Sequence, residues 1–319
     1  MAHEVTKKIV CLGGGIGTSN LLKGLKHYNL QITAITSMAD DGGSSGRLRK
    51  AYNIMPPGDI VSCISALIPD EQHELAELLT HRFPGLNRNK ELGGHKLGNL
   101  IMLAEIQRTG DFYKALDSLK RIFGVKADIL PATDERTRLS AITRDGRRVH
   151  SETTLDLALY SQPHGLKKIY ISPKNPNVNK KVISNIIDAD CIVSGPGDLY
   201  TNQLPVLIVP QIKQALIESP AKKLFILNIA NKPFETKGFA LHDFISAISD
   251  HLGTFPFEKI IINNNRSYPI PPKYRYKYID LDVKQKKLPC TLIEEDLVDP
   301  NFPIFHDTKK LAYTIVKCI

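Results

Sequence analysis

The sequence contains few cysteines and no long apolar run, and both absences restrict the kind of protein it encodes. Its 319 residues include five cysteines, at positions 11, 63, 191, 290 and 318, and none forms a CxxC pair. An odd number of thiols in mostly apolar surroundings is typical of buried, reduced cysteines rather than of disulfides or zinc ligands. A nucleophilic role for Cys11 or Cys191 is the alternative. No apolar run reaches the roughly 18 residues that a membrane helix requires, so we expect no membrane partner.

The first residues also lack the layout of a signal peptide. The stretch MAHEVTKKIVCLGGG carries only a short apolar run, which leads directly into glycines. We therefore expect a cytoplasmic location.

The sequence is basic overall, but its positive charge is spread along the chain. Lys and Arg number 42 and Asp and Glu number 33, which gives a formal net charge of +9. A basic surface attracts nucleic acids, phosphorylated metabolites or anionic membranes. The positive charge is dispersed, with small clusters at residues 136–148 and 274–287. Because there is no zinc finger, recognition-helix signature or long basic tail, the sequence argues against nucleic acid as a partner.

Apolar periodicity predicts an α/β fold. The run at residues 8–12 ends in glycines and is typical of a buried parallel strand, a helix is predicted over 18–28, and a second strand over 31–37. Further strands are predicted at 169–171, 191–193, 224–227 and 260–262, with helices at 177–187, 204–217 and 241–251. This alternation predicts a single Rossmann-like domain over residues 1–319, with a mostly parallel sheet and helices on both of its faces.

Two segments depart from that alternation. Residues 57–125 read as a helical insertion, with helices expected at 59–68, 71–83 and 96–108, after start signals at Pro57 and Asp70. The dipeptide Asp145-Gly146 predicts a β-hairpin over 139–151. Residues 268–287 are rich in proline and aromatics and favour an irregular or edge-strand segment.

A glycine-rich turn joins the first predicted strand to the first helix. Glycines allow the backbone to approach an anion closely, and a helix N-terminus offers free N–H groups and a partial positive charge. The expected ligand-binding residues of this turn are Gly13, Gly14, Gly15, Gly17, Thr18 and Ser19. The spacing is not GxGxxG, because Thr18 takes the place of the last glycine, and no GK[ST] ending is present. The alternative is a tight turn that binds nothing.

The string ADDGGSSGRLR follows the second predicted strand, so it should lie at the same edge of the sheet. Asp40 and Asp41 can accept hydrogen bonds from a ribose, or hold a divalent cation such as Mg²⁺. Arg47 and Arg49 are expected to contact phosphate. Further ligand-binding donors are expected at Gly42, Gly43, Ser44 and Ser45. The alternative is a flexible polar turn.

Three later strings repeat the theme of a glycine turn at a helix start. They are PPGD, which carries Asp59, then GGHKLGNL, which carries His95 and Asn99, and then SGPGDLYT. In the last string the candidate ligand-binding residues are Gly195, Gly197, Leu199, Tyr200 and Thr201. PPGD read alone favours a simple turn and helix start. His95 is a candidate base, phosphate donor or helix cap, although a single histidine is more often structural.

These five strings, in this order, resemble the gluconeogenesis factor (YvcK-type) family. That family shares a superfamily with the 2-phospho-L-lactate transferases (CofD) of deazaflavin coenzyme synthesis. The resemblance runs from about Ile9 to the C-terminus. It implies a Rossmann-like fold, nucleotide-sugar ligands such as UDP-N-acetylglucosamine, self-association into a homo-oligomer, and roles in gluconeogenic growth, cell shape and cell-wall synthesis.

The transferase relatives imply an alternative activity. They move a phospholactyl group from a guanosine diphosphate carrier with Mg²⁺, and such chemistry here would make Asp40, Asp41 or Asp59 the metal ligand or base. An NAD-dependent dehydrogenase is a third hypothesis, which the absence of GxGxxG argues against.

Three positions depart from the family pattern. Asp198 stands where the family has serine, Phe234 where it often has glycine, and Phe305 where it often has arginine.

Overall fold

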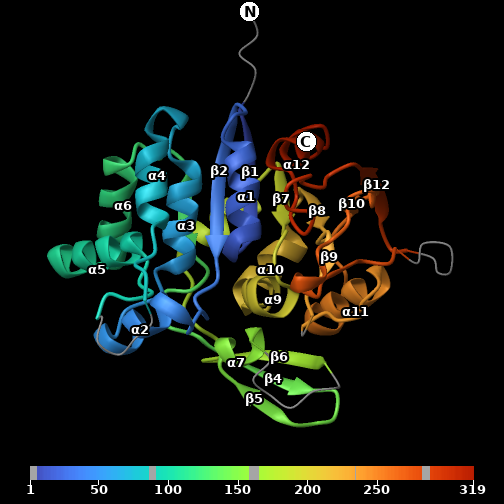
Figure 1. Ribbon diagram of the computed structural model, residues 1–319, viewed down its shortest axis with the longest axis horizontal. Coiled ribbons are helices and arrows are strands. Elements are labelled where there is room, and N and C mark those ends of the chain that lie inside the picture. The colour runs from blue at the N-terminus through green and yellow to red at the C-terminus, as the bar shows by residue number, and fades with distance from the viewer. Residues whose placement is uncertain (1–5, 86–90, 158–164, 234, 282–287) are drawn as a thin grey trace, which may run out of the picture.

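Seven parallel strands form the central sheet of the computed structural model, which describes residues 6–85, 91–157, 165–233, 235–281 and 288–319 (Figure 1). The strand order is β12-β10-β8-β7-β1-β2-β3. The strands are β1 (Lys7–Gly13), β2 (Leu30–Thr36), β3 (Asp128–Pro131), β7 (Cys191–Ser194), β8 (Lys222–Ile226), β10 (Lys259–Asn263) and β12 (Thr291–Glu295). The chain builds outward from β1 to β3 and then returns to start again at β7 beside β1, which is the strand order of a Rossmann fold.

Helices cover both faces of the sheet. They are α1 (Gly15–Leu25), α2 (Gly43–Tyr52), α3 (Gly58–Leu67), α4 (His73–Thr80), α5 (Leu97–Thr109), α6 (Phe112–Ile122), α7 (Glu152–Asp156), α8 (Lys180–Ile187), α9 (Leu204–Leu207), α10 (Pro210–Glu218), α11 (Leu241–Leu252) and α12 (Thr308–Val316). The alternation of β1 separates the two layers: Ile9 and Cys11 pack with α1, α3 and α12, whereas Val10 and Leu12 pack with α8 to α11. The predicted α/β fold with helices on both faces is therefore confirmed.

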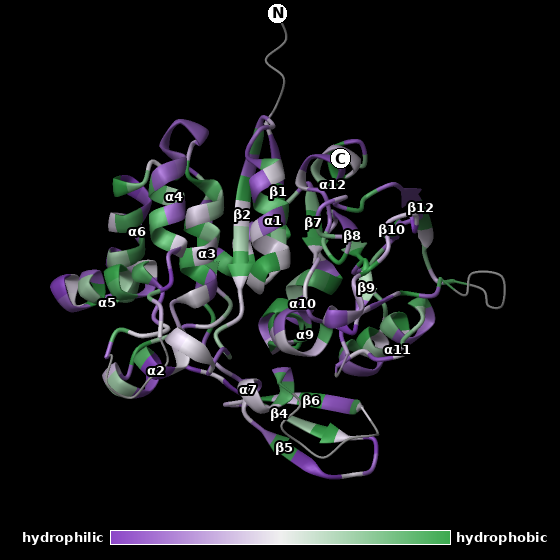
Figure 2. Cartoon of the chain, in the orientation of Figure 1, coloured by the Kyte–Doolittle hydropathy of each residue, from purple (hydrophilic) through white to green (hydrophobic). Residues whose placement is uncertain are grey.

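A smaller antiparallel sheet lies beyond the carboxyl ends of the central strands (Figure 1). It is made of β4 (Arg138–Thr143), β5 (Arg148–His150) and β6 (Leu166–Ser172), in the order β5-β4-β6. The hairpin predicted from Asp145-Gly146 is confirmed as β4 and β5. The strand predicted at 169–171 is present in β6, but its expected place in the parallel sheet is wrong, because β6 pairs antiparallel with β4. Figure 2 colours β7 and β8 largely hydrophobic and β5 largely hydrophilic, as central and outer strands should be.

Several elements differ from the sequence-based expectation. The helix predicted over 204–217 is two helices, because Pro210 has no N–H and begins α10 instead of continuing α9. The helix predicted over 71–83 is a short 3₁₀ turn (Asp70–Gln72) followed by α4. The edge strands β3 and β12, and helix α2, were not predicted. Residues 268–281 contain a 3₁₀ turn (Pro272–Tyr274) and the short strand β11 (Lys277–Tyr278), which pairs with β9 (Ala230–Asn231); residues 282–287 lie outside the described residues.

All five cysteines are free, and four of them are buried, as predicted. Burial raises the pKa of Cys11 far above its ordinary value and that of Cys191 to about 12. Both thiols are therefore held in the protonated form, which argues against the nucleophile alternative because the thiolate is the reactive form. Within the described part of the chain, no helix is long and apolar enough to cross a membrane.

We predict that Gly24→Ala destabilises the fold by about 1–3 kcal/mol through overpacking. A Cβ atom on Gly24 would lie 2.1 Å from the carbonyl oxygen of Thr308, where α1 packs against α12. Urea unfolding followed by circular dichroism measures the effect. The neighbouring Lys23→Ala is the matched control, because Lys23 is exposed and should shift the free energy of unfolding by less than about 0.5 kcal/mol. Equal stability of the two variants would show that the α1–α12 contact tolerates a methyl group.

Candidate functional site at the switch point of the sheet

The glycine turns of the first string (residues 13–19) and the fifth string (residues 194–201) meet where the strand order reverses, between β1 and β7. The N–H of Gly195 donates a hydrogen bond to the carbonyl of Leu12 at 3.2 Å, which extends the β1–β7 pairing into both turns. In open α/β sheets, ligands bind in the crevice outside the carboxyl ends of the strands at such a point. The sheet topology therefore places the candidate site here.

Glycine is required at this crossing by close backbone approach. A Cβ atom on Gly17 would lie 2.3 Å from the carbonyl oxygen of Pro196, so the first turn of α1 rests directly on the second loop. Gly15 and Gly195 also adopt positive φ angles of 66° and 85°, which favour glycine. These glycines hold two loops in contact, in addition to any role toward a ligand.

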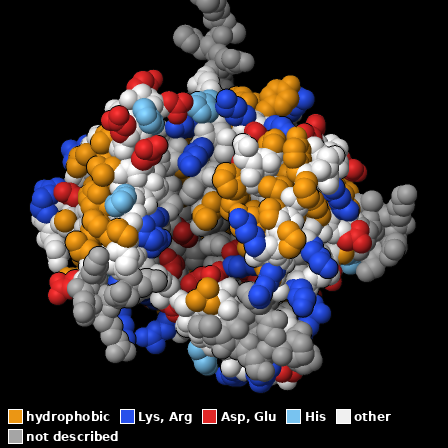
Figure 3. Space-filling view, in the orientation of Figure 1, with side chains coloured by type: hydrophobic (Ala, Val, Ile, Leu, Met, Phe, Trp, Pro, Cys, Tyr) orange, Lys and Arg blue, Asp and Glu red, His pale blue; other side chains and the backbone are white. Residues whose placement is uncertain are grey.

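A cavity of about 290 Å³ opens beside this crossing. It is lined by the first turn of α1 with Asn20, by residues 196–198 and Asn202, by residues 228–230, by Tyr276 and by residues 304–306. The space-filling view shows the middle of this face as a hollow, with Asp and Glu side chains along its lower rim (Figure 3). The volume is near the lower end of the range for small-molecule pockets.

The protein's own carboxylate occupies part of the α1 N-terminus. The N–H of Gly15 donates to Asp59 Oδ1 at 2.9 Å, so the third string caps the helix of the first. Helix geometry gives the next two N–H groups, of Ile16 and Gly17, no intrahelical acceptor, and both residues line the cavity. Those two groups are therefore helix donors beside the cavity.

Asp59 is half-buried, and its environment disfavours its charge. Burial, and then the negative charge of Asp40, raise the pKa of Asp59 to about 7, while the N–H of Gly15 and the ammonium of Lys96 act in the opposite direction. Burial also raises the pKa of Asp40, although the N–H of Gly42 donates to its Oδ1 at 2.9 Å. The pKa of Glu152 rises to about 9, first through burial and then through Asp40. Three half-buried acidic side chains, Asp40, Asp59 and Glu152, thus lie close together at this end of the sheet.

The second and fourth strings contact each other directly. The Ser44 hydroxyl lies 3.1 Å from His95 Nδ1 and accepts from Asn99 Nδ2 at 3.1 Å. Arg47 Nη2 donates to the carbonyl of Gly93 at 2.8 Å. Burial lowers the pKa of His95, which makes it a neutral partner of Ser44. The Oδ1 atom of Asn99 is buried with no hydrogen-bond partner among the described residues, so it is an acceptor whose hydrogen bond is not made.

Two charged residues of the second string have structural partners instead of the expected ones. Arg49 is buried and donates to the carbonyls of Met38, Asp40 and Thr137, so its expected contact with phosphate is wrong. Both oxygens of Asp41 accept hydrogen bonds from residues 151–153 at the start of α7. Asp41 therefore caps α7, and Asp40 alone of the pair lies beside Asp59. Among the described residues, no group of three or more His, Cys, Asp or Glu side chains has the arrangement of a metal site.

A buried carboxylate from another segment of the chain holds the fifth string in place. Glu235 accepts from the N–H groups of Tyr200 and Thr201, and burial raises its pKa to about 8. Leu199, Tyr200 and Thr201 are themselves buried. These three candidate ligand residues therefore form the base of the loop, whereas Gly197 faces the cavity.

Lys232 connects this loop to its surroundings. Its ammonium contacts Asp156 on α7, Asp198 at 2.7 Å and Glu235 at 3.6 Å. The departure at Asp198 is thus matched by a cation, and the departure at Phe234 lies outside the described residues. Phe305, the third departure, lines the cavity. Sequence reasoning missed Asp156, Lys232 and Glu235, because they come from segments with no glycine turn.

The site residues predicted from sequence are therefore brought together rather than dispersed. The first, third and fifth strings form one wall, around Gly15, Asp59 and Gly197. The second and fourth strings form an adjoining wall, around Ser44 and Asn99. The walls join where a Cβ atom on Gly58 would lie 2.3 Å from Ser45 Oγ and 3.0 Å from Asp40 Oδ2.

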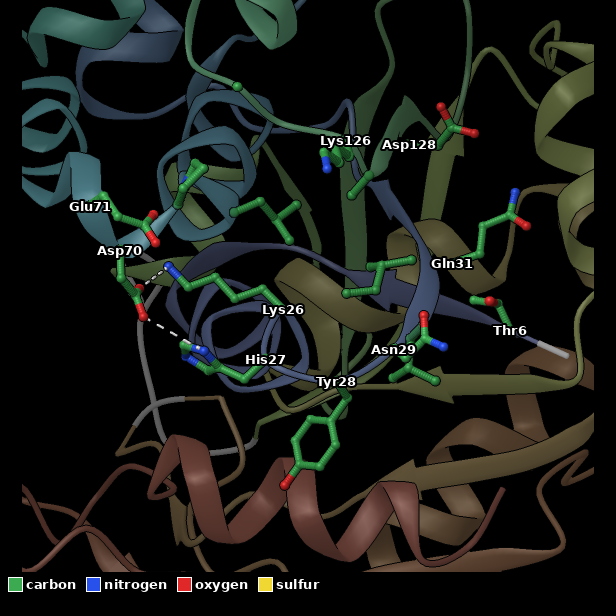
Figure 4. Close-up of a pocket in the computed structure, with 16 residues that line it drawn as sticks. Thr6, Lys26, His27, Tyr28, Asn29, Gln31, Asp70, Glu71, Lys126 and Asp128 are labelled. Atoms are coloured by element: carbon green, nitrogen blue, oxygen red, sulfur yellow. Dashed lines mark ion pairs between the residues drawn. The ribbon is translucent and has the colours of Figure 1, made fainter. Parts of the chain in front are cut away.

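A larger cavity, of about 690 Å³, lies at the opposite, amino-terminal edge of the sheet (Figure 4). Lys26 and His27 point toward Asp70 there, at 2.7 Å and 3.6 Å, as the dashed lines show. None of the five strings contributes to its lining. Because none of the strings reaches this cavity, we assign the candidate site to the switch point.

Comparison with known proteins identifies the family of the chain. The family described as 2-phospho-L-lactate transferase CofD matches residues 9–298. The chain belongs to this family. It is 39% identical to the gluconeogenesis factor of Bacillus subtilis (strain 168) over 318 residues, which is 97% of each chain. It is 37% identical to the gluconeogenesis factor of Halalkalibacterium halodurans, over 91% of this chain and 86% of that one.

A solved structure shares the same fold. The crystal structure of a UPF0052 family protein from Bacillus halodurans matches with a TM-score of 0.88 and 34% identity, over 98% of this chain and 99% of that chain. The resemblance predicted from the five strings, to gluconeogenesis factors within the CofD superfamily, is confirmed by these relatives.

We predict that Asp59→Asn flattens the pH dependence of stability. Because the pKa of Asp59 rises from 3.8 to about 7 on folding, the folded state holds more protons than the unfolded state between these values. The free energy of unfolding therefore falls as the pH rises through this window. The amide cannot ionise, so the slope should decrease by up to about 1.4 kcal/mol per pH unit.

Urea unfolding at pH 4.5, 5.5 and 6.5 measures this slope. Asp117→Asn, on the exposed face of α6, is the control for removing one carboxylate. Parallel slopes for the wild type and Asp59→Asn would show that Asp59 is not the group that titrates in this range.

Proposed function

We propose that this protein binds a nucleotide sugar, such as UDP-N-acetylglucosamine, in the switch-point cavity and acts as a cytoplasmic gluconeogenesis factor that regulates carbon metabolism, cell shape and cell-wall synthesis. The observation that carries the proposal is the pair of helix N–H groups at Ile16 and Gly17, which line the cavity at the N-terminus of α1. Such groups favour phosphate oxygens. The names of the similar proteins from Bacillus subtilis and Halalkalibacterium halodurans support the regulatory part.

The charge of the site constrains how a diphosphate would bind. Asp40, Asp59 and Glu152 lie close together, and each raises the cost of a second negative charge nearby. A divalent cation would offset that repulsion. Mg²⁺ suits one or two carboxylates completed by phosphate oxygens and water, so Asp40 and Asp59 fit as its protein ligands. In that role the ion would neutralise the diphosphate and orient it.

The remaining ligand contacts stay predictions. Arg47 donates to Gly93 and does not line the cavity, so a phosphate contact would require it to leave that carbonyl. Self-association into a homo-oligomer is likewise proposed from the resemblance alone.

A second candidate function is the Mg²⁺-dependent transfer of a phospholactyl group. The observation that favours it is the proximity of Asp40 to Asp59, whose pKa of about 7 suits a group that accepts a proton near neutral pH. The family description points to the same chemistry.

We predict that Ile16→Glu weakens UDP-N-acetylglucosamine binding at least about tenfold relative to Ile16→Gln. Ile16 is 63% exposed in the first turn of α1, so both substitutions should fold. The two side chains are nearly the same size, and only the glutamate places a negative charge beside the proposed diphosphate. Isothermal titration calorimetry with Mg²⁺ gives the dissociation constants. Equal affinities for the two variants would place the phosphates elsewhere.

For the second candidate, we expect product formation to decide. If the protein is a transferase, incubation with a deazaflavin acceptor, the activated guanosine carrier and Mg²⁺ yields the phospholactyl product by mass spectrometry, and Asp59→Asn abolishes it. If it is the proposed binder, neither protein forms product, and the wild type binds UDP-N-acetylglucosamine. Product from both the wild type and Asp59→Asn would exclude Asp59 as the base.

A further inference from the structure

The outer face of the β5-β4-β6 sheet has no role in the candidate site. On its inner face, Leu139, Ala141, Val149, Ile169 and Ile171 are buried in the main hydrophobic core. Because side chains alternate along a strand, the residues between them face solvent. The sheet is therefore anchored to the core by one face, and its exposed side chains among the described residues lie on the other.

The strand register arranges the outer side chains in rows across the sheet. Tyr170 lies opposite Ser140, which lies opposite His150. In the next row, Lys168 and Arg148 flank Ile142 in the same way.

Arg138 lies two residues before Ser140 on β4, so it faces the same side of the sheet. The row that holds Tyr170 and His150 therefore lies between Arg138 and the row that holds Lys168 and Arg148. Tyr170 is 43% exposed, and Arg138, Arg148 and His150 are exposed too. Two rings thus lie between cations on a flat surface.

This small sheet also concentrates the positive charge of the molecule. Residues 136–150 and 166–172 contain seven Lys and Arg residues and one acidic residue, Asp145, in a chain with a net charge of +9. Asp145 pairs with Arg147 at 2.6 Å. In the described part of the chain, Arg138, Arg148 and Lys168 form no ion pair. Their charge is therefore available to a partner.

We propose that this face binds single-stranded nucleic acid. A cationic surface that follows the phosphates, with aromatic rings on which bases stack, is the common design of proteins that bind single strands, and a sheet surface with exposed aromatics is one of its forms. An anionic membrane or an acidic protein segment would match the charge but would leave Tyr170 and His150 without a stacking partner. The proposal is independent of the switch-point cavity, whose lining includes no residue of β4, β5 or β6.

Fluorescence anisotropy of a labelled 12-nucleotide oligouridylate with the full-length protein tests this inference. We expect binding that weakens as salt increases. Tyr170→Ala should weaken it about fivefold or more through lost stacking, whereas Tyr170→Phe should retain it. Arg138→Gln combined with Arg148→Gln should weaken binding and reduce its salt dependence.

The controls separate this mode from general charge attraction. Lys181→Gln removes one exposed cation on α8 and should leave binding unchanged. Circular dichroism confirms that each variant is folded. No binding of the oligonucleotide, equal binding by Tyr170→Ala and the wild type, or binding only to phosphatidylserine vesicles or a polyglutamate peptide would each overturn the proposal.

Discussion

The site depends on the close contact between the first turn of α1 and the loop after β7. Gly17 approaches the carbonyl of Pro196 so closely that no side chain fits between them. This contact fixes the two loops at the strand-order reversal, and the cavity is the space that they leave beside Asn202 and Tyr276. Because both loops continue from buried strands, the core positions the site. The glycines therefore hold the two loops together, and any contact with a ligand depends on that arrangement.

Electrostatics gives the site an unusual balance for one that binds phosphates. Asp59 already occupies the first donor of α1, and Glu235 occupies two donors of the loop after β7. Burial raises the pKa of Asp59 to about 7 and that of Glu235 to about 8, because the surroundings of each carboxyl group disfavour its charged form. A bound anion would increase that cost, whereas a cation between ligand and protein would reduce it. Under the proposed function, proton or metal binding would therefore be linked to ligand binding.

The fold was predictable to the extent that local pattern determines it. The strand–glycine–helix unit at β1 and α1, the hairpin of β4 and β5 and the position of β7 all carry signals within about fifteen residues. The edge strands β3 and β12 do not, because each is short and β3 begins with Asp128 and ends with Pro131. Such strands are recruited by neighbours that are distant in sequence.

The candidate site shows the same division. That the glycine strings converge follows from the rule that parallel strands present their carboxyl ends together. The roles of Arg49 and Asp41 could not be inferred, because their partners, Thr137 and residues 151–153, lie some 90 to 110 residues away. Glu235 gave no signal either, since only the tertiary fold brings it to the N–H groups of Tyr200 and Thr201.

The departures from the family pattern alter how the cavity can recognise a ligand. Phe305 places an aromatic ring in the wall where an arginine is usual, which removes a fixed positive charge. Asp198 adds a negative charge, but Lys232 lies within 2.7 Å of it and offsets the change locally. No guanidinium is found among the described residues that line the cavity. Under the proposed function, recognition of phosphate would therefore fall to the N–H groups of α1 and to a cation held by Asp40 and Asp59, and the aromatic wall would favour the flat, uncharged part of a nucleotide.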